Sequence, residues 1–429
     1  MNSFLPILIL FIFFFLNVPI SFALMGAALF FFGFTDTGMD LDLIMQTFIR
    51  SAESFPLLAI PFFIMAGSIM NYSGISKRLM GMAEVLTGHF TGGMAHVNIL
   101  LSVLMGGISG SANADAAMQC KILVPEMVKR GYSKGFSAAI TAASSIISPI
   151  IPPGIVLIIY ALLSNVSVTK MFIAGYVPAI MIAIALMIVV AIISKKRNYL
   201  PSREKRATIK EILVEFKKSF WALILPFVII LGMRIGIFTP TEAGAIAVVV
   251  TIFIGFFVYK ELKVSDFKVI LLDTVYGTST VMFILIAANV FGSYLSWERL
   301  PYKLTQILLE YSNGPWSLLL MINLILLFVG MFIDGGAAAM IILAPLLIPA
   351  ASSLGIDLLH LGIVMVVNIM LGGITPPFGS MMFLTCSLLK IRIQEFIKEI
   401  TPFIIAILIV LAIVTYIPNI VLFLPNLLS

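Results

Sequence analysis

The sequence predicts an all-α polytopic membrane protein, and two observations support this fold class. Of the 429 residues, 61% are hydrophobic and only 11% are charged, whereas about 25% of the residues in a soluble globular domain are charged. The apolar residues also form runs along the whole chain, which suffice for ten or more spans at about 20 residues per crossing. This composition excludes a cytosolic enzyme, a DNA-binding protein and a secreted disulfide scaffold.

The N-terminal apolar segment is interpreted as a retained first span, long or broken, and not as a signal peptide. Residues 4–16 are apolar, and no Lys or Arg precedes Arg50, whereas a secretory signal requires a basic beginning. The apolar character resumes after Pro19 and continues to Phe34.

The later apolar segments are interrupted at four places that are rich in glycine and proline. The segments lie at about 53–71, 92–108, 136–163, 171–193, 220–237, 241–259, 275–296, 316–333, 337–351, 358–373, 378–389 and 402–428. Unwound backbone within lipid is tolerated only where it is buried in protein or lines a watery cavity. We therefore expect re-entrant hairpins near 92–120 and 318–350, and broken helices near 148–154 and 372–379.

The interruptions recur at a nearly constant offset along the chain. The recurring pairs are Pro152 and Pro376, Ser109 and Asp334, and Pro19 and Pro240. The offset predicts two pseudo-symmetric repeats, residues 1–195 and 220–429, joined by segment 196–219. Inverted repeats with broken helices that meet at the bilayer midplane are a recurrent plan of secondary transporters.

The joining segment is basic. Nine of the 26 Lys and Arg residues lie between Lys195 and Lys218. The positive-inside rule places such a loop in the cytoplasm, where it would contact anionic membrane lipids. The positive charge is therefore not interpreted as a nucleic-acid signal.

The interruptions supply the groups that bind a small cation and an acid. Exposed carbonyl and hydroxyl oxygens at helix C-termini can replace the water shell of sodium, and amides at helix N-termini can hold a carboxylate. Asp115 and Asp334 lie at two breaks, where an ion or substrate role and a structural capping role are both open. No ATP-binding loop, zinc-protease motif or nucleophile elbow is present, so the sequence predicts no enzyme, and transport would depend on an ion gradient.

Five motifs, in order along essentially the whole chain, resemble the large membrane subunit of tripartite ATP-independent periplasmic (TRAP) transporters. They are Pro61-Phe62-Phe63-Ile64-Met65-Ala66-Gly67, Gly107-Ile108-Ser109-Gly110-Ser111-Ala112, Pro152-Pro153-Gly154, Phe238-Thr239-Pro240-Thr241-Glu242-Ala243 and Gly372-Gly373-Ile374-Thr375-Pro376-Pro377-Phe378-Gly379.

The resemblance implies about eleven transmembrane helices plus two re-entrant hairpins in a bacterial inner membrane, working as an elevator in which a transport part moves against a scaffold. It implies a separate small subunit of about four spans, because the chain starts at a span like the first one of a large subunit. It also implies a periplasmic solute-binding protein, and a small organic acid such as a C4-dicarboxylate, sialic acid or another sugar acid as substrate.

The resemblance also assigns roles to residues, with two or more sodium ions as coupling ions. The first sodium site would use Ser109, Ser111, Ser145, Ser148 and Pro149. The second sodium site would use Gly335, Gly373, Thr375 and Pro377. The substrate would contact Asn113, Asp115, Pro153, Gly154, Asp334 and Gly379.

Two alternatives stay open. A self-sufficient sodium–carboxylate symporter of the wider hairpin-containing superfamily would transport free substrate without partners. A non-transporting membrane scaffold or an ion-conducting subunit would leave the duplicated polar breaks without a role.

Overall fold

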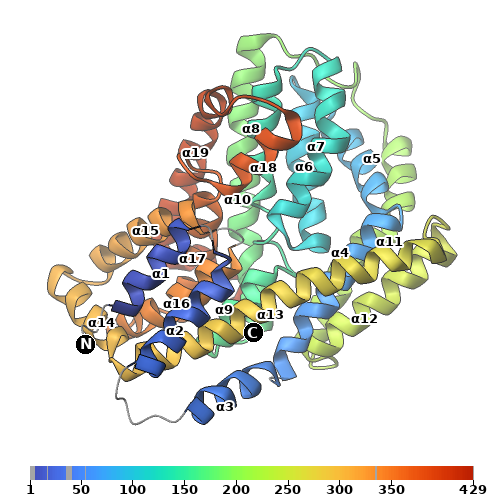
Figure 1. The fold of residues 1–429 in the computed structure, drawn as a ribbon. Coiled ribbons are helices and arrows are strands. Elements are labelled where there is room, and N and C mark those ends of the chain that lie inside the picture. The colour runs from blue at the N-terminus through green and yellow to red at the C-terminus, as the bar shows by residue number, and fades with distance from the viewer. Residues whose placement is uncertain (1–4, 17, 35–40, 54, 334–335, 429) are drawn as a thin grey trace.

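A computed structural model describes residues 5–16, 18–34, 41–53, 55–333 and 336–428, and these residues form helices and connecting turns without a β-strand (Figure 1). The helices of the first half are α1 (Leu5–Phe15), α2 (Ile20–Phe34), α3 (Leu41–Ala52), α4 (Ala59–Tyr72), α5 (Ile75–Thr87), α6 (Gly93–Ser109), α7 (Ala112–Lys129), α8 (Lys134–Ser145), α9 (Ile155–Ser164) and α10 (Val168–Arg197). Those of the second half are α11 (Ile209–Arg234), α12 (Pro240–Phe253), α13 (Phe267–Trp297), α14 (Leu300–Tyr311), α15 (Pro315–Phe332), α16 (Ala337–Ser353), α17 (Leu358–Gly372), α18 (Ser380–Leu389), α19 (Ile393–Tyr416) and α20 (Pro418–Leu428).

Six helical segments within the described ranges are long and apolar enough to cross a bilayer by themselves. They are Val168–Arg197, Ile209–Arg234, Pro240–Val258, Val264–Trp297, Pro315–Phe332 and Ile393–Tyr416. Most of the remaining apolar helices have 10 to 17 residues, so each needs a neighbour in the chain to complete a crossing. The all-helical membrane fold is thus observed, and the figure of about eleven spans stays a prediction.

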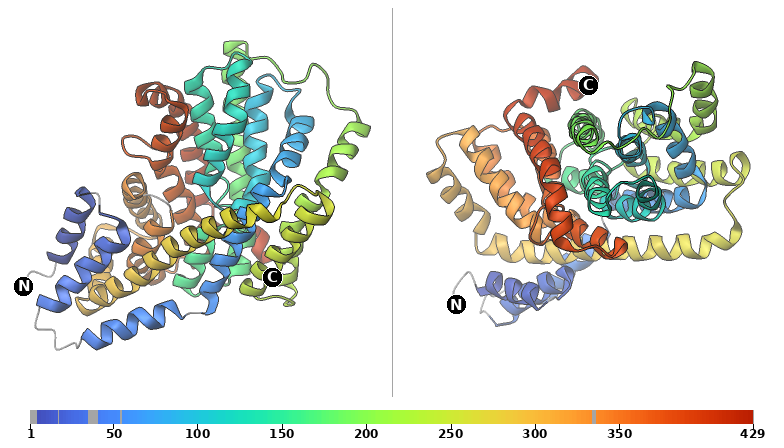
Figure 2. Two further views of the ribbon diagram at one scale, coloured as in Figure 1. Left: turned by 45° about the vertical axis from the view of Figure 1, so that its right-hand side comes forward. Right: turned by 90° about the horizontal axis from the view of Figure 1, so that it is seen from above.

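The N-terminal segment is broken: α1 and α2 pack against each other across a short connection. Their apolar side chains pack with those of α13 in a second hydrophobic cluster beside the main core. In this cluster the ring centres of Phe31 and Tyr294 lie 4.7 Å apart. Helix α13 runs across the molecule with α2 and α3 packed along it, and it also contacts α4 and α16 (Figures 1 and 2). A single helix therefore touches the N-terminal helices and the body that holds the interruptions.

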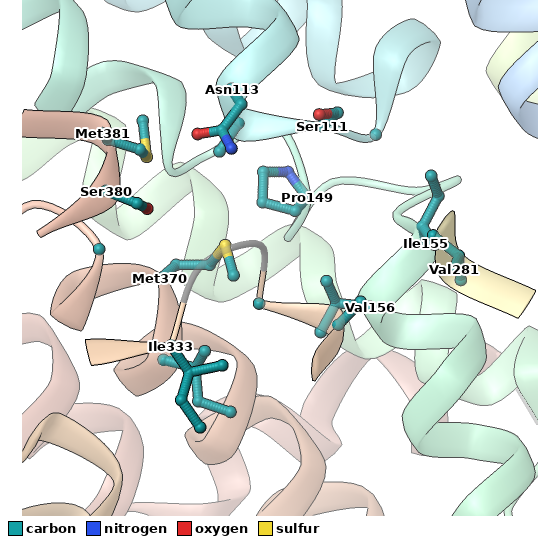
Figure 3. A pocket seen from close by; sticks show the side chains of 16 residues that line it. Ser111, Asn113, Pro149, Ile155, Val156, Val281, Ile333, Met370, Ser380 and Met381 are labelled. Atoms are coloured by element: carbon teal, nitrogen blue, oxygen red, sulfur yellow. The ribbon is translucent and has the colours of Figure 1, made fainter. Parts of the chain in front are cut away.

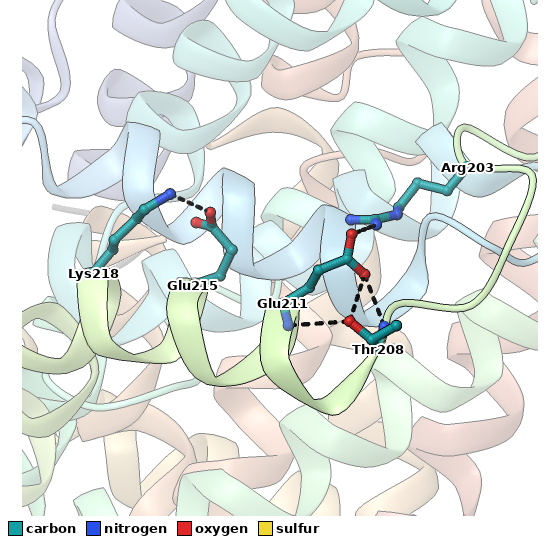
Figure 4. Close-up of polar contacts among 5 residues, drawn as sticks. All are labelled: Arg203, Thr208, Glu211, Glu215 and Lys218. Carbon is teal, nitrogen blue, oxygen red and sulfur yellow. Dashed lines mark hydrogen bonds and ion pairs between the residues drawn. The ribbon is translucent and has the colours of Figure 1, made fainter.

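The basic segment 196–219 was expected to be a loop. Only its residues between α10 and α11 form one, because the second part of the segment, from Ile209, belongs to α11. Thr208 caps α11: its hydroxyl accepts a hydrogen bond from the amide of Glu211, whose carboxylate accepts one from the amide of Thr208 (Figure 4). This capping box starts the helix at Ile209. Arg203 also pairs with Glu211 at 2.9 Å, so the loop is tied to the helix that it precedes.

All four glycine- and proline-rich interruptions are places where a helix ends. Helices α6 and α7 are separated by Gly110 and Ser111, and α15 and α16 by the segment 333–336. Helix α8 ends at Ser145 and α9 begins at Ile155, whereas α17 ends at Gly372 and α18 begins at Ser380. We call Gly110 and Ser111 tip 1, and the described residues Ile333 and Gly336 tip 2. The segments 146–154 and 373–379 between helices are called linker 1 and linker 2.

The helix pairs beside the two linkers are held by amide contacts at equivalent places in the two halves. Asn98 of α6 accepts a hydrogen bond from the Ser144 hydroxyl of α8 at 2.7 Å. Asn323 of α15 accepts one from the Asn368 amide of α17, also at 2.7 Å. The second pair follows the first at almost the same separation along the chain as Pro376 follows Pro152. The offset that separates the glycine- and proline-rich breaks is thus repeated by hydrogen bonds between other residues of the two halves.

Candidate functional site

The two tips and the two linkers meet around one cavity of about 140 Å³ (Figure 3). The lining comes from tip 1 and the start of α7, from linker 1 and α9, from tip 2 and α16, from α17 and linker 2, and from α13. Its residues are Gly110, Ser111, Ala112, Asn113, Pro149, Ile155, Val156, Val281, Ile333, Gly336, Ala337, Ile369, Met370, Gly373, Ser380 and Met381. Segments from both halves of the chain therefore form a single site.

Tip 1 depends on Gly110, which has a φ of +55° and ends α6. A Cβ atom at this position would lie 2.6 Å from the carbonyl oxygen of Pro153 and 3.4 Å from the Cα of Gly154. Only glycine therefore allows the tip to pack directly on the backbone of linker 1. The next residue, Ser111, caps α7 by accepting a hydrogen bond from the amide of Ala114, so the start of that helix faces the cavity.

Tip 2 also depends on a glycine with a positive φ, and it contacts helices of both halves. Gly336 has a φ of +49°, and a Cβ atom there would collide with the methyl group of Met370 and lie 3.3 Å from Val156. Val156 belongs to α9, which follows linker 1. The tip of the second half thus packs against helices of both halves, and the cavity closes between them.

The end of α8 and linker 1 present hydroxyl and backbone oxygens in buried surroundings, and linker 2 presents a half-buried hydroxyl. Ser145 and Ser148 are fully buried, and the Ser145 hydroxyl donates a hydrogen bond to the Thr141 carbonyl at 2.6 Å. In linker 2 the Thr375 hydroxyl donates to the Leu371 carbonyl at 2.7 Å. The prolines of both linkers lack an N–H group, so they cannot satisfy the preceding carbonyls as a helix would.

The predicted site residues fall into four groups. Those that line the cavity are Ser111, Asn113, Pro149 and Gly373. Those around it are Ser145 at the end of α8 and the linker residues Ser148, Pro153, Gly154, Thr375 and Gly379. Pro377 of linker 2 is exposed, and Asp115 lies buried on α7, where it accepts a hydrogen bond from Ser148 of linker 1. Asp334, Gly335 and the side chain of Ser109 lie outside the described residues.

Sequence reasoning missed several lining residues. Met370, Ser380 and Met381 adjoin linker 2 and could have been found by extending that motif to the helix ends on either side. Val281 on α13 had no such signal, because its position depends on how that helix crosses the body. Within the described ranges no group of three or more His, Cys, Asp or Glu residues forms a transition-metal site.

A second cavity, of about 590 Å³, lies between α6, α10, α11 and α20 and is lined almost entirely by apolar side chains, with Arg234 at its margin. It is larger but contains neither of the tips. The smaller cavity is the better candidate site, because polar backbone from all four interruptions converges there.

These features define a multi-pass membrane protein with a cavity between interrupted helices. Residues 7–420 match the family described as the tripartite ATP-independent periplasmic transporter, DctM component. The chain belongs to this family of TRAP transporter large permeases, as the motifs suggested.

Three comparisons illustrate the relationship. The chain is 38% identical to the sialic acid TRAP transporter permease protein SiaT of Haemophilus influenzae, over 100% of this chain and 69% of that protein. It is 37% identical to the C4-dicarboxylate TRAP transporter large permease protein DctM of Pseudomonas aeruginosa, over 88% of each. The solved YdaH transporter of Alcanivorax borkumensis has a similar fold, with a TM-score of 0.67, 16% identity and coverage of 96% and 97%.

Proposed function

We propose that this protein is the large transport subunit of a sodium-driven secondary transporter that imports a small organic acid across the bacterial inner membrane. Relatives act on sialic acid and on C4-dicarboxylates by their names, and this chain is proposed to take an acid of the same class. The observation that supports this function best is the convergence of two hairpin tips and two linkers on one cavity.

The cavity is lined by no basic side chain, which favours binding of an anion only together with cations. All Lys, Arg and His residues of the chain lie in the described ranges, and none of them lines the cavity. An acid bound there has no basic side chain to neutralise it, and an isolated charge in a low-dielectric site is strongly disfavoured. Sodium ions held at the tips and linkers would provide the missing positive charge.

The proposed sodium sites use the two similar environments. The first comprises the Ser111 and Ser145 hydroxyls and the oxygens near Ser148 and Pro149. The second comprises Gly373, Thr375 and the backbone near Pro377 of linker 2. Hydroxyl and carbonyl oxygens are ligands that suit a hard monovalent cation. Asn113 and the start of α7 are proposed to hold the acid, because amides at a helix N-terminus attract a carboxylate.

The helices divide into a frame and a moving body in the proposed elevator. The frame comprises α1–α4 and α11–α13, in which α4 packs on α12 and α13. The moving body comprises α6–α9 and α15–α18. Helices α5 and α14 precede α6 and α15 and contact helices of both parts, so we propose that they act as connecting arms. The two halves are proposed to be inverted repeats.

The proposed partners are a small four-span membrane subunit, a periplasmic solute-binding protein and membrane lipids around the apolar helices. The matching family is tripartite, which supports the first two. Exposed apolar side chains on the outer face of α13 and α2, such as Phe22, Leu271 and Leu272, offer a surface for the small subunit.

The decisive experiment measures uptake by the complete complex in proteoliposomes. Replacement of sodium by potassium at fixed membrane potential is expected to abolish uptake. Undiminished uptake driven by a proton gradient alone would contradict the proposal. Uptake of free substrate by the large subunit alone would instead favour a self-sufficient symporter. If Ser111→Ala and Thr375→Ala both left uptake unchanged, a scaffold role would be favoured.

A further inference from the structure

The cavity of about 590 Å³ between α6, α10, α11 and α20 has no role in the proposed transport sites. It is lined by side chains such as Leu104 of α6, Ile173 of α10 and Leu424 of α20. Of the described residues in its lining, only Tyr176 and Arg234 carry a polar side-chain group. A water molecule needs about two to four polar partners to stay in a cavity, whereas apolar cavities stay dry and bind apolar guests. The lining therefore favours a hydrocarbon occupant.

Exposed side chains connect this cavity with the surface of the bundle. Ile180 of α10 and Phe227 and Leu231 of α11 belong to the lining and are 47%, 65% and 54% exposed. Helices α10 and α11 are both long and apolar enough to cross a bilayer, so their uncovered sides face lipid chains. A lipid chain can therefore enter the cavity from the membrane without passing through water.

Arg234, the last residue of α11, supplies a positive charge at the margin of this apolar space. Its Nε donates a hydrogen bond to the Leu428 carbonyl of α20 at 2.6 Å, which holds the guanidinium beside the cavity. Within the described ranges Arg234 forms no ion pair with an acidic side chain. The guanidinium has further N–H donors in a planar fork that matches a phosphate. Its charge thus complements a phosphate that is attached to hydrocarbon.

Tyr176 adds an unused hydrogen-bond donor to the lining. Its hydroxyl is buried and has no hydrogen-bond partner among the described residues, and a buried donor without a partner is costly. Tyr176 lies in the first third of α10 and Arg234 at the end of α11, so both lie away from the basic loop that joins these helices. The ester oxygens of a phospholipid lie between its chains and its phosphate, and one of them can accept from the Tyr176 hydroxyl.

We propose that this cavity binds one membrane phospholipid, with an acyl chain between α6, α10 and α11 and the phosphate against Arg234. Since the positive-inside rule places the basic loop in the cytoplasm, the headgroup lies at the opposite surface of the membrane. The site goes beyond the proposed function, because it requires neither sodium nor the organic acid. Helix α6 belongs to the proposed moving body and α11 to the proposed frame, so the acyl chain fills part of the boundary between them.

The test counts phospholipids on the complex of this chain with its small subunit by native mass spectrometry. The complex is stripped of lipid in detergent and titrated with palmitoyl-oleoyl phosphatidylglycerol. We expect one molecule to bind more tightly than the others, and Arg234→Gln to weaken this binding by about 10-fold through the loss of a charge-assisted contact. The matched control is Arg299→Gln: this exposed arginine also lies at the end of a membrane-crossing helix, α13, but lines neither cavity. Its replacement should leave the tight binding unchanged.

Two further variants test the apolar part of the site without a change of charge. Leu223→Trp enlarges a side chain of the lining and should exclude the acyl chain. Val228→Trp enlarges an exposed residue of α11 outside the lining and should leave the tight binding unchanged. Tyr176→Phe keeps the ring, removes the hydroxyl and should weaken the binding several-fold. Glycerol phosphate, which carries the anion without the chains, should not compete.

Equal binding by the unaltered complex and Arg234→Gln would overturn the phosphate contact. Equal binding by Leu223→Trp and Val228→Trp would overturn the place of the chain. Tight binding by the large subunit alone but not by its complex would also overturn the proposal, because a segment of the small subunit would then fill the cavity. Competition by glycerol phosphate would show a site for a free anion instead of a lipid. Failure of the proposed function is seen separately, as uptake that does not depend on sodium.

Discussion

The close approach of tip 1 to linker 1 gives the sharpest test of the site geometry. In Gly110→Ala, the new Cβ atom lies 2.6 Å from the carbonyl oxygen of Pro153 and must retreat by about 0.8 Å to reach ordinary van der Waals contact. The left-handed conformation of residue 110 costs alanine about 1 kcal/mol more than glycine. Together with the displaced backbone, we expect the packing of tip 1 on linker 1 to be destabilised by about 2 kcal/mol.

A loss of about 2 kcal/mol lowers the ratio of the packed tip to any displaced arrangement by about 30-fold. The assay is substrate uptake by the reconstituted complex as a function of sodium, with the amount of folded protein measured in parallel. We expect Gly110→Ala to lower uptake at a given sodium concentration by about 10-fold or more.

Gly131→Ala is the matched control. Gly131 follows α7 with a φ of +88°, but nothing lies within 4 Å of its Cβ position. It therefore shares the conformational cost of Gly110 and lacks the close approach. Equal uptake by the two variants, with equal amounts of folded protein, would refute the argument that tip 1 must contact linker 1.

Three other predictions concern single contacts. Asn98→Ala leaves the Thr141 and Ser144 side chains without their buried partner, so we expect about 2 kcal/mol lower stability, seen as a lower thermal-unfolding midpoint of the complex. Thr208→Ala removes the cap of α11 and should cost about 1 kcal/mol; amide exchange at the start of that helix should accelerate, while uptake stays unchanged. Thr375→Ala should raise the sodium concentration for half-maximal uptake several-fold in transport assays, and an unaltered sodium dependence would remove Thr375 from the second site.

The places where the helices end were predictable because their causes are local. Proline removes a donor and clashes with the preceding turn, and glycine adopts the positive φ values of Gly110 and Gly336 at little cost. These effects depend on one or two residues each, so they can be read without knowing the neighbours. The tripartite family was likewise evident from motifs that coincide with those ends.

Which side chains meet at the cavity could not be predicted in the same way. Val281 reaches the lining only because α13 crosses the body, and Met370 only because tip 2 packs on α17. Asp115 and Gln119 are four residues apart on one helix face, which a helical reading would have paired. The Ser102 hydroxyl of α6 also donates a hydrogen bond to Asp115 at 2.8 Å, and this contact depends on the register between the two helices, which no local pattern specifies.

The proposed sodium coupling leads to a prediction about charge. Fixed protein charges move inward with the substrate and return with the empty transporter, so only the ions and the acid contribute to the net charge per cycle. If two sodium ions accompany a monoanion, one positive charge enters per cycle, and the membrane potential contributes about 2.3 kcal/mol per 100 mV to accumulation.

With a dianion as substrate, two sodium ions leave no net charge, and the cycle is electroneutral. In proteoliposomes with a potassium gradient and valinomycin, an inside-negative potential should therefore stimulate uptake of a monocarboxylate and have no effect on uptake of a dicarboxylate. Stimulation of dicarboxylate uptake would mean that more than two sodium ions enter with each substrate molecule.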